Sequence, residues 1–371
     1  MTVQTPYRYD VVGSFLRPKK LKDARAAYEA KTISVEELKK IEDECITDLI
    51  KKEKKAGLHV ITDGEFRRAT WHLDFMWGFD GVGHSKTETG LPFHGEAAMI
   101  DDTYITGKVG ISGEHPFVEH FRFVKQYEDE YTVAKQTIPA PAQFLEQMVL
   151  PFALPNTSKY YPDTEELVKD IAEGYKVVIK QLYDAGCRNI QFDDCSWGML
   201  VDEKAPLFFQ TDEAGLQKVQ ELFLRINNLA IEGKPEDLTI NTHVCRGNFH
   251  STYASAGAYD AVAQTLFAKE NVHAYFLEFD DERSGGFEPL KAVTADKKVV
   301  LGLVTTKSPK LEDKEAIIAR IKEASKYVPL ENLCLSPQCG FASCEIGNKL
   351  TEEEQWAKVK LVKEIAEEVW G

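Results

Sequence analysis

Two segments that lie far apart in the chain carry residue types that bind soft metal ions. His243 and Cys245 lie at the end of the apolar run 238–244, and Cys339 follows a second apolar run at 333–335. Because side chains at positions i and i+2 of a strand share a face, the imidazole and the first thiol can bind one ion together. A second thiolate and a carboxylate would complete the tetrahedral set that suits Zn2+, and a ligand displaced by substrate would make the site catalytic.

Further polar side chains follow other apolar runs. They are Ser14, Glu65, Asp193, Glu278 and Lys307. If these runs are strands of one barrel, their carboxyl ends converge on a single mouth, where the active sites of barrel enzymes lie. The sequence therefore predicts one site assembled from scattered residues.

Each candidate also has a structural interpretation. His243 could be a buried histidine with satisfied hydrogen bonds and Cys245 a packing thiol, while Ser14 could form a turn or hold a substrate carboxylate. Cys344 competes with Cys339 as a ligand. Glu278 ends an apolar run, where a carboxylate needs a cation or a hydrogen-bonding partner, so pairing or metal binding is expected. The following acids, Asp280, Asp281 and Glu282, read as a solvated loop.

The elements that must position these residues alternate along the chain. Eight short apolar runs read as strands, at 11–12, 60–61, 133–138, 189–192, 238–244, 274–279, 299–304 and 333–335. Amphipathic segments at 35–55, 164–185, 217–231, 314–327 and 352–370 read as helices. Such alternation is typical of an α/β protein with a parallel sheet.

Eight strands favour a (β/α)8 TIM barrel, and no Gly-x-Gly-x-x-Gly turn argues for a dinucleotide-binding fold. A single domain over residues 1–371 is therefore predicted. The segment from about 75 to 117 is rich in glycine and polar residues, and reads as an insertion after the second strand with a hairpin around 103–111.

Composition narrows the choice of partners and location. The formal charge of −15 opposes attraction to nucleic acid or anionic membranes. The first residues lack the pattern of a secretory signal, and no apolar stretch is long enough to span a membrane, which together indicate a cytoplasmic protein. Seven cysteines form an odd set without the density of a disulfide scaffold, so reduced thiols are expected.

These residues, in this order, resemble the catalytic barrel of cobalamin-independent methionine synthase, especially its short single-barrel bacterial relatives. The resemblance is carried by Val12-Gly13-Ser14-Phe15, Asp63-Gly64-Glu65, Ile190-Gln191-Phe192-Asp193, His243-Val244-Cys245, Phe276-Leu277-Glu278 and Pro337-Gln338-Cys339-Gly340. It implies a (β/α)8 barrel whose zinc is bound by His243, Cys245, Glu278 and Cys339. It also implies that Ser14, Glu65 and Asp193 hold the amino-acid end of homocysteine while its thiol accepts a methyl group.

The methyl donor is less well defined by this resemblance. Lys307 stands where the family's proton-donating histidine is expected, and segment 137–141 lacks the tryptophan expected to stack on a pterin. The resemblance implies a 5-methyltetrahydropteroyltriglutamate-homocysteine S-methyltransferase in methionine biosynthesis, with Lys307 as the catalytic acid. A methylated corrinoid protein or a small S-methyl compound remains an alternative donor.

Other functions also fit the sequence. A related barrel methyltransferase could act on another thiol, or a decarboxylase-like relative could share the fold. Ser14, Glu65 and Asp193 favour an amino-acid acceptor, whereas a basic pocket would favour a polycarboxylate or sulfonate. A non-enzymatic zinc or thiol sensor would instead have a metal site closed to added thiols.

Overall fold

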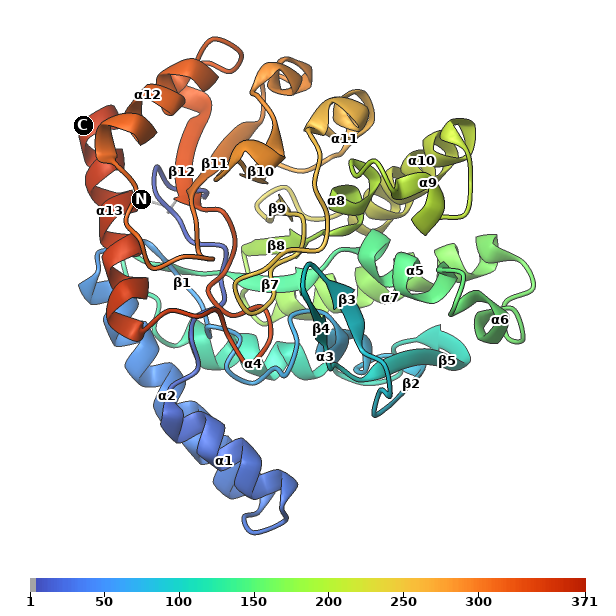
Figure 1. The fold of residues 1–371 in the computed structure, drawn as a ribbon. Helices are drawn as coiled ribbons and strands as arrows, with labels where there is room; N and C mark the ends of the chain where they lie inside the picture. The colour runs from blue at the N-terminus through green and yellow to red at the C-terminus, as the bar shows by residue number, and fades with distance from the viewer. Residues whose placement is uncertain (1–4) are drawn as a thin grey trace.

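The structure is a computed structural model that describes residues 5–371. Its centre is a parallel sheet in the order β12-β11-β10-β9-β8-β7, so strand order follows chain order (Figure 1). Helices or 3-10 turns connect successive strands. The strands are β7 (Gln136–Pro139), β8 (Asn189–Asp193), β9 (Thr239–Val244), β10 (Ala274–Glu278), β11 (Lys298–Val304) and β12 (Leu333–Pro337).

Shorter stretches extend the sheet beyond β7 and β12. β1 (Val60–Ile61) pairs in parallel with β6 (Val133–Ala134), which Lys135 alone separates from β7. At the opposite edge Tyr9 forms a parallel bridge with Leu335 in β12. All but the first predicted run thus contribute to strands, and the α/β architecture with a parallel sheet is confirmed.

Closure of the ring is less regular than the predicted eight-stranded barrel. Within residues 5–371 no ladder joins the 9–12 segment to β1, and the run 11–12 is not itself a strand. Individual bonds span this gap: Phe15 N donates to Gly64 O at 3.1 Å, and Thr62 Oγ1 donates to Gly13 O at 2.8 Å.

Several long helices begin where the sequence supplies a capping side chain. Ser34 and Thr351 each form a capping box with the glutamate three residues later, and Asp163 accepts from the first turn of its helix. The long helices are α1 (Lys19–Glu29), α2 (Val35–Lys55), α4 (Pro116–Lys125), α7 (Thr164–Asp184), α10 (Glu213–Ile231), α12 (Lys314–Ala324) and α13 (Glu352–Trp370). The predicted helices are all present, although α10 begins earlier and α12 ends earlier than expected.

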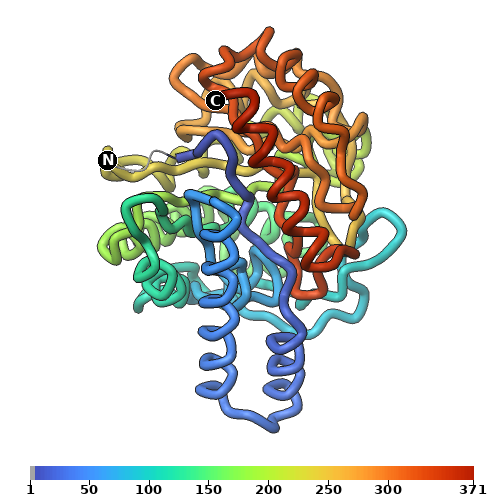
Figure 2. The backbone as a smooth tube through the Cα atoms, turned by 90° about the vertical axis from the view of Figure 1, so that its left-hand side faces the viewer, coloured from blue at the N-terminus to red at the C-terminus, as the bar shows by residue number. Residues whose placement is uncertain are grey.

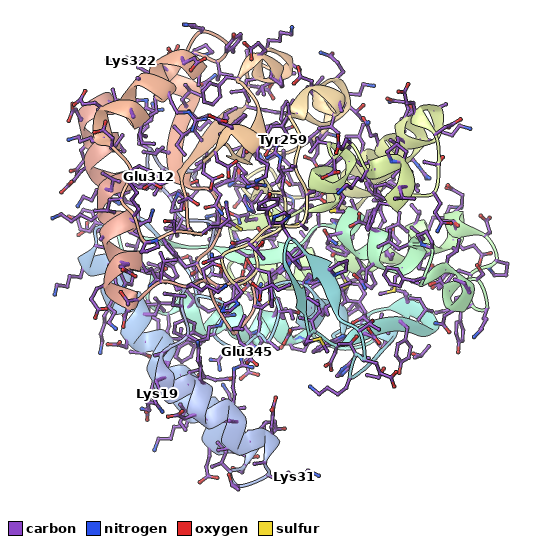
Figure 3. The ribbon with its side chains drawn as sticks, in the orientation of Figure 1. Lys19, Lys31, Tyr259, Glu312, Lys322 and Glu345 are labelled. Carbon is purple, nitrogen blue, oxygen red and sulfur yellow. The ribbon has the colours of Figure 1, made fainter. Side chains whose placement is uncertain are left out.

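Shorter helical segments lie between these elements along the chain. They are α3 (Leu73–Met76), α5 (Pro141–Val149), α6 (Leu154–Thr157), α8 (Ser196–Leu200), α9 (Ala205–Phe208) and α11 (Ala263–Lys269), with 3-10 turns at Tyr259–Ala261, Glu282–Ser284, Glu288–Ala292 and Leu330–Asn332. Tyr259, labelled near the centre of Figure 3, donates to Val244 O at 3.0 Å and accepts from Glu278 N at 3.1 Å. Its hydroxyl therefore ties the ends of β9 and β10 together.

The segment between β1 and β6 contains two antiparallel pairs. β2 (Asp80–Ser85) pairs with β5 (Asp102–Gly110), and β3 (Leu91–Phe93) with β4 (Glu96–Ala98). The predicted hairpin around 103–111 is wrong because that stretch is a single strand. Its partner β2 is rich in glycine and reads as a loop, yet a Cβ at Gly81 would lie 2.2 Å from Lys108 O, so the pairing needs glycine there.

One large hydrophobic cluster includes side chains from most of the helices and strands. α1 and the first part of α2 project from the body as a helical hairpin, with Lys31 at its tip (Figures 2 and 3), and Leu21 of α1 belongs to the same cluster. In the part of the chain that the structure describes, no helix is long and apolar enough to cross a membrane. Residues 1–4, which belong to the predicted single domain, lie outside the described residues.

Candidate metal and substrate site

Three of the four predicted metal ligands come together at the ends of β9 and β12. One ligand atom from each of His243, Cys245 and Cys339 lies within 4.8 Å of the other two, and all three residues are buried. Two sulfur atoms and one imidazole nitrogen at this spacing match the donor set of a zinc site.

The imidazole of His243 is oriented for ligation. Its Nδ1 lies 3.1 Å from the carbonyl oxygen of Phe276, which accepts a hydrogen bond from Nδ1–H. That bond leaves the lone pair on Nε2, and within residues 5–371 this buried atom has no hydrogen-bond partner. An unpartnered buried nitrogen beside two thiols is the observation that a metal ion would explain.

Two glycines allow the backbone to bring these ligands close together. A Cβ at Gly198 would lie 1.9 Å from Cys245 O, so α8 can approach the end of β9 only with glycine there. A Cβ at Gly340 would lie 1.8 Å from Ser14 Oγ. The Cys-Gly pair after β12 therefore places a candidate ligand beside a candidate substrate-binding hydroxyl.

A further thiol lies beside the three ligands. Cys195 Sγ is 3.1 Å from Cys245 Sγ, although Cys195 is not part of the set whose ligand atoms are mutually close. The contact with Cys195 and burial raise the pKa of Cys245 well above the usual value. Contact with Cys245 and burial do the same to the pKa of Cys339. All seven cysteines, each within the described range, are free.

Glu278, the predicted fourth ligand, does not join the three. Its carboxylate accepts from Arg283 at 2.6 Å and from the Arg246 backbone N–H at 2.6 Å, and Lys307 Nζ lies 3.5 Å away. Burial acts to raise the pKa of Glu278, but the positive charges of Lys307, Arg246 and Arg283 outweigh it and lower the pKa to about 2. The carboxylate is therefore ionised and satisfied without a metal.

Lys307, the predicted catalytic acid, belongs to the same charge network. Its Nζ lies 2.6 Å from Asp280, whose side chain is 1% exposed, so the interpretation of Asp280 as a solvated acid is wrong. Burial lowers the pKa of Lys307, but Glu278 and Asp280 outweigh this and raise it above the usual value. Neither Lys307 nor Asp280 belongs to the described residues that line the cavity over the three ligands.

That cavity has a volume of about 740 Å³ and contains the predicted substrate-binding residues Ser14, Glu65 and Asp193 together with the three ligands. Cys344 also lines it. β8 lies beside β9 with Asp193 opposite His243, so the strand register places a carboxylate next to the imidazole.

The two substrate-side carboxylates are buried and share a positive neighbour. Glu65 Oε1 lies 3.3 Å from Arg68 and accepts from Thr137 Oγ1 at 3.0 Å, while Asp193 accepts from Gln191 at 2.7 Å. Burial raises the pKa of Glu65 and of Asp193, each to about 7, against the opposing charge of Arg68. A ligand that brings a positive charge would stabilise both ionised forms.

Sequence reasoning missed several cavity residues. Gln143, Glu146 and Gln147 line the cavity from α5, and Trp71 and His72 line it from the loop before α3. Glu146 follows no strand directly and sits in a helix whose residues are nearly all buried, so only its polarity within an apolar stretch could have marked it. Trp71 gives the cavity an aromatic surface, which segment 137–141 lacks.

The inserted segment and the short helices contribute the apolar part of the cavity. Leu91, Phe93, Ala98 and Ile100 come from the stretch around β3 and β4, and α9 adds Leu207 and Phe208. His94 N donates to Tyr253 O at 2.8 Å, which attaches the β3–β4 turn to the loop after β9. This apolar part of the cavity is thus suited to an apolar or flat group.

Comparisons with known proteins agree with this geometry. Residues 144–368, more than half of the chain, match the family model described as the cobalamin-independent synthase, catalytic domain. The uncharacterized protein YxjG of Bacillus subtilis is 43% identical over 366 residues, which is 98% of this chain and 95% of that protein.

Two solved structures resemble the whole chain. A candidate vitamin-B12 independent methionine synthase from Listeria monocytogenes superposes with a TM-score of 0.78 at 39% identity, covering 99% of this chain and 98% of that one. A B12-independent methionine synthase from Shewanella sp. W3-18-1, solved in complex with selenomethionine, gives a TM-score of 0.71 at 20% identity, covering 97% and 96%. The second comparison supports the fold alone.

Proposed function

Since the chain belongs to the cobalamin-independent methionine synthase family, matching its catalytic domain, we propose that it transfers a methyl group to the thiol of homocysteine and so forms methionine. The observation that carries this proposal is the shared cavity. His243, Cys245 and Cys339 meet there, and Glu65 and Asp193 line the same space.

Zinc is the metal that this donor set fits best. His243 Nε2, Cys245 Sγ and Cys339 Sγ would hold it, because soft thiolates and a neutral imidazole favour zinc over harder cations. Glu278 remains a candidate for a fourth ligand only if its carboxylate leaves Arg283 and the Arg246 backbone. Bound zinc would keep an incoming thiol in its nucleophilic thiolate form near neutral pH.

The residues of the chain would orient the amino-acid end of the acceptor. Glu65 and Asp193 suit its ammonium group, and Ser14 with nearby backbone amides suits its carboxylate. Holding both charged groups directs the side-chain sulfur toward the three ligands and removes much of the entropic cost of the reaction. The selenomethionine bound to the Shewanella relative is an amino acid of the same form.

The remaining space suits the methyl donor. The apolar wall around β3, β4 and α9 would exclude water from the reacting atoms, and Trp71 offers a face for a flat group such as a reduced pterin. We infer that a methylated folate is the donor, with a methylated corrinoid protein or an S-methyl compound as the alternatives.

Two further predictions accompany this function. We infer that the strand series closes as a (β/α)8 barrel through the bonds between segment 9–15 and β1, because only closure brings Ser14 and Glu65 to the same mouth as Cys339. We also infer a cytoplasmic location, because a site that depends on free thiols suits a reducing compartment.

The test is a donor screen on the zinc-loaded protein. Homocysteine is supplied with methyltetrahydrofolate, its polyglutamate, methylcobalamin or S-methylmethionine, and newly formed methionine is measured by mass spectrometry. Replacing homocysteine with 2-mercaptoethanesulfonate is the matched control, since that thiol lacks the amino-acid end. We expect methionine from at least one donor and no transfer to the control; transfer to the sulfonate alone, or to neither thiol, would contradict the proposal.

A further inference from the structure

Methyl transfer from a tertiary amine requires an acid, and the position predicted to supply it faces elsewhere. Breaking the bond between carbon and nitrogen leaves an electron pair on nitrogen, which departs readily only if it receives a proton. Lys307 is held by Asp280 and Glu278 outside the described lining of the cavity. The acid must therefore be sought among the residues that do line it.

Glu146 on α5 has the required position. It is 3% exposed and lines the same cavity as His243, Cys245 and Cys339. Its Oε2 accepts from Gln143 Nε2 at 3.1 Å, whereas its buried Oε1 finds no hydrogen-bond partner in the described chain. A buried carboxyl oxygen without a protein partner, beside a cavity, is available to a ligand.

The surroundings of Glu146 favour its neutral form. Burial, followed by the negative charge of Asp194, raises the pKa of Glu146 to about 8 despite the bond from Gln143. The groups around Glu146 already have hydrogen-bond partners. The Asp194 carboxylate accepts from Ser196 N and from Asn227 on α10, and the Tyr175 hydroxyl on α7 donates to Pro139 O. Glu146 is thus largely protonated near neutral pH.

Three other titratable groups that line the cavity suit this role less well. Burial lowers the pKa of His72 to about 3, so its imidazole is neutral and holds no proton that it readily donates. Glu65 and Asp193 sit with Arg68 and are assigned to the substrate ammonium.

We propose that the carboxylic acid of Glu146 protonates the leaving nitrogen of a tertiary-amine methyl donor. This inference rests on the proposed function. The thiolate sulfur of homocysteine forms a bond to the methyl carbon, the bond between that carbon and nitrogen breaks, and its electron pair stays on nitrogen. Nitrogen gains the proton of Glu146, which becomes a carboxylate and later recovers a proton from water. The homocysteine thiol has already released its own proton to solvent, so atoms and charges balance.

The chain provides a matched control in Glu270. This glutamate is fully buried, its pKa is raised by burial and Asp194 to about 8, and its Oε2 likewise has no partner among the described residues. Its Oε1 accepts from Asn227 at 2.8 Å, and it is not among the residues that line the cavity. Glu146→Gln and Glu270→Gln therefore remove equivalent protons, of which one faces the cavity.

The experiment compares the two variants with two donors. Methyltetrahydrofolate needs a proton on its leaving nitrogen. S-methylmethionine is a sulfonium, and its leaving group is a neutral thioether that needs no proton. With the folate, the wild-type kcat should decline above pH 8 as Glu146 loses its proton. Glu146→Gln should lower kcat at least about 100-fold and abolish this decline, while Glu270→Gln should keep kcat within a few-fold of the wild type. With the sulfonium, neither variant should change kcat by more than a few-fold.

A measurement without activity supports the comparison. In the metal-free protein at pH 7, the infrared carbonyl band of a protonated carboxyl should weaken in Glu146→Gln, and that component should titrate near pH 8.

The inference is overturned if Glu146→Gln keeps the wild-type kcat with the folate, if it lowers kcat equally with both donors, or if the wild type uses only the sulfonium. In each of these cases methyl transfer to homocysteine still occurs and the proposed function stands. Failure of the wild type with every donor would instead contradict the proposed function and this inference with it.

Discussion

Acidic groups inside the cavity and Glu278 just beyond it have opposite electrostatic surroundings. Outside, Glu278 is surrounded by Lys307, Arg246 and Arg283, and its pKa is lowered to about 2. Inside, burial raises the pKa of Glu65 and Asp193 to about 7 and that of Glu146 to about 8. Basic side chains of the protein neutralise Glu278 outside the cavity. The carboxyl groups inside have too few cationic neighbours, so the cavity is suited to a metal ion and an ammonium group.

The largest expected effect tests the self-neutralised network. Replacing Lys307 by Met leaves Glu278 and Asp280 without their shared cation, so the free energy of unfolding should fall by about 3–5 kcal/mol. Lys51→Met, at an exposed position, is the control and should change it little. Chemical denaturation measures both variants, and equal stability of all three proteins would show that Lys307 is dispensable to the network.

The next effect concerns the thiol side of the cavity. Cys245→Ser and Cys339→Ser should each weaken zinc binding more than about 100-fold, because losing a ligand costs more than losing a group that only orients one. Cys195→Ser removes the neighbouring thiol, 3.1 Å from Cys245, and should retain zinc. Competition with a chromophoric chelator measures the affinities; if Cys195→Ser lost zinc as completely as the other two, the assignment of three ligands would be wrong.

The smallest effect tests the carboxylate side through pH. Because the raised pKa of Asp193 and Glu65 keeps them partly protonated below about 7, methionine should bind several-fold more tightly at pH 8 than at pH 6. Methionine is the chosen ligand because it has no thiol that ionises. Calorimetry should show this rise in the wild type and a smaller one in Asp193→Asn, which should bind methionine about 10-fold more weakly and zinc unchanged. A pH-independent affinity in the wild type would contradict the assignment.

The elements and ligands that the sequence predicted depend on local patterns. Apolar runs identified β8 to β12, and amphipathic periodicity identified the long helices α2, α7, α10, α12 and α13, because both patterns repeat over neighbouring residues. His243 and Cys245 were recognisable for the same reason, since Cys245 directly follows β9 and lies two positions after His243.

The features that the sequence did not predict depend on contacts between distant segments. Glu278 lies at the expected strand end, but its orientation toward Arg283 and Lys307 is decided by loops after β10 and β11. Glu146 owes its raised pKa to burial and to the negative charge of Asp194, which follows β8. The pairing of β2 with β5 joins a glycine-rich stretch to a strand beyond another hairpin, and neither partner alone signals it.

The early chain segment and the last helix, α13, lie side by side, as Figure 2 shows for the blue tube beside the red helix. Leu16 N donates to Gln355 Oε1 at 2.8 Å, and Ala342 N donates to Ser14 Oγ at 3.3 Å across 328 positions of sequence. During synthesis on the ribosome, Ser14 is made early, whereas the residues that contact it are made only when the chain is nearly finished. A nascent chain would therefore expose His243 and Cys245 before their third partner, Cys339, has been translated.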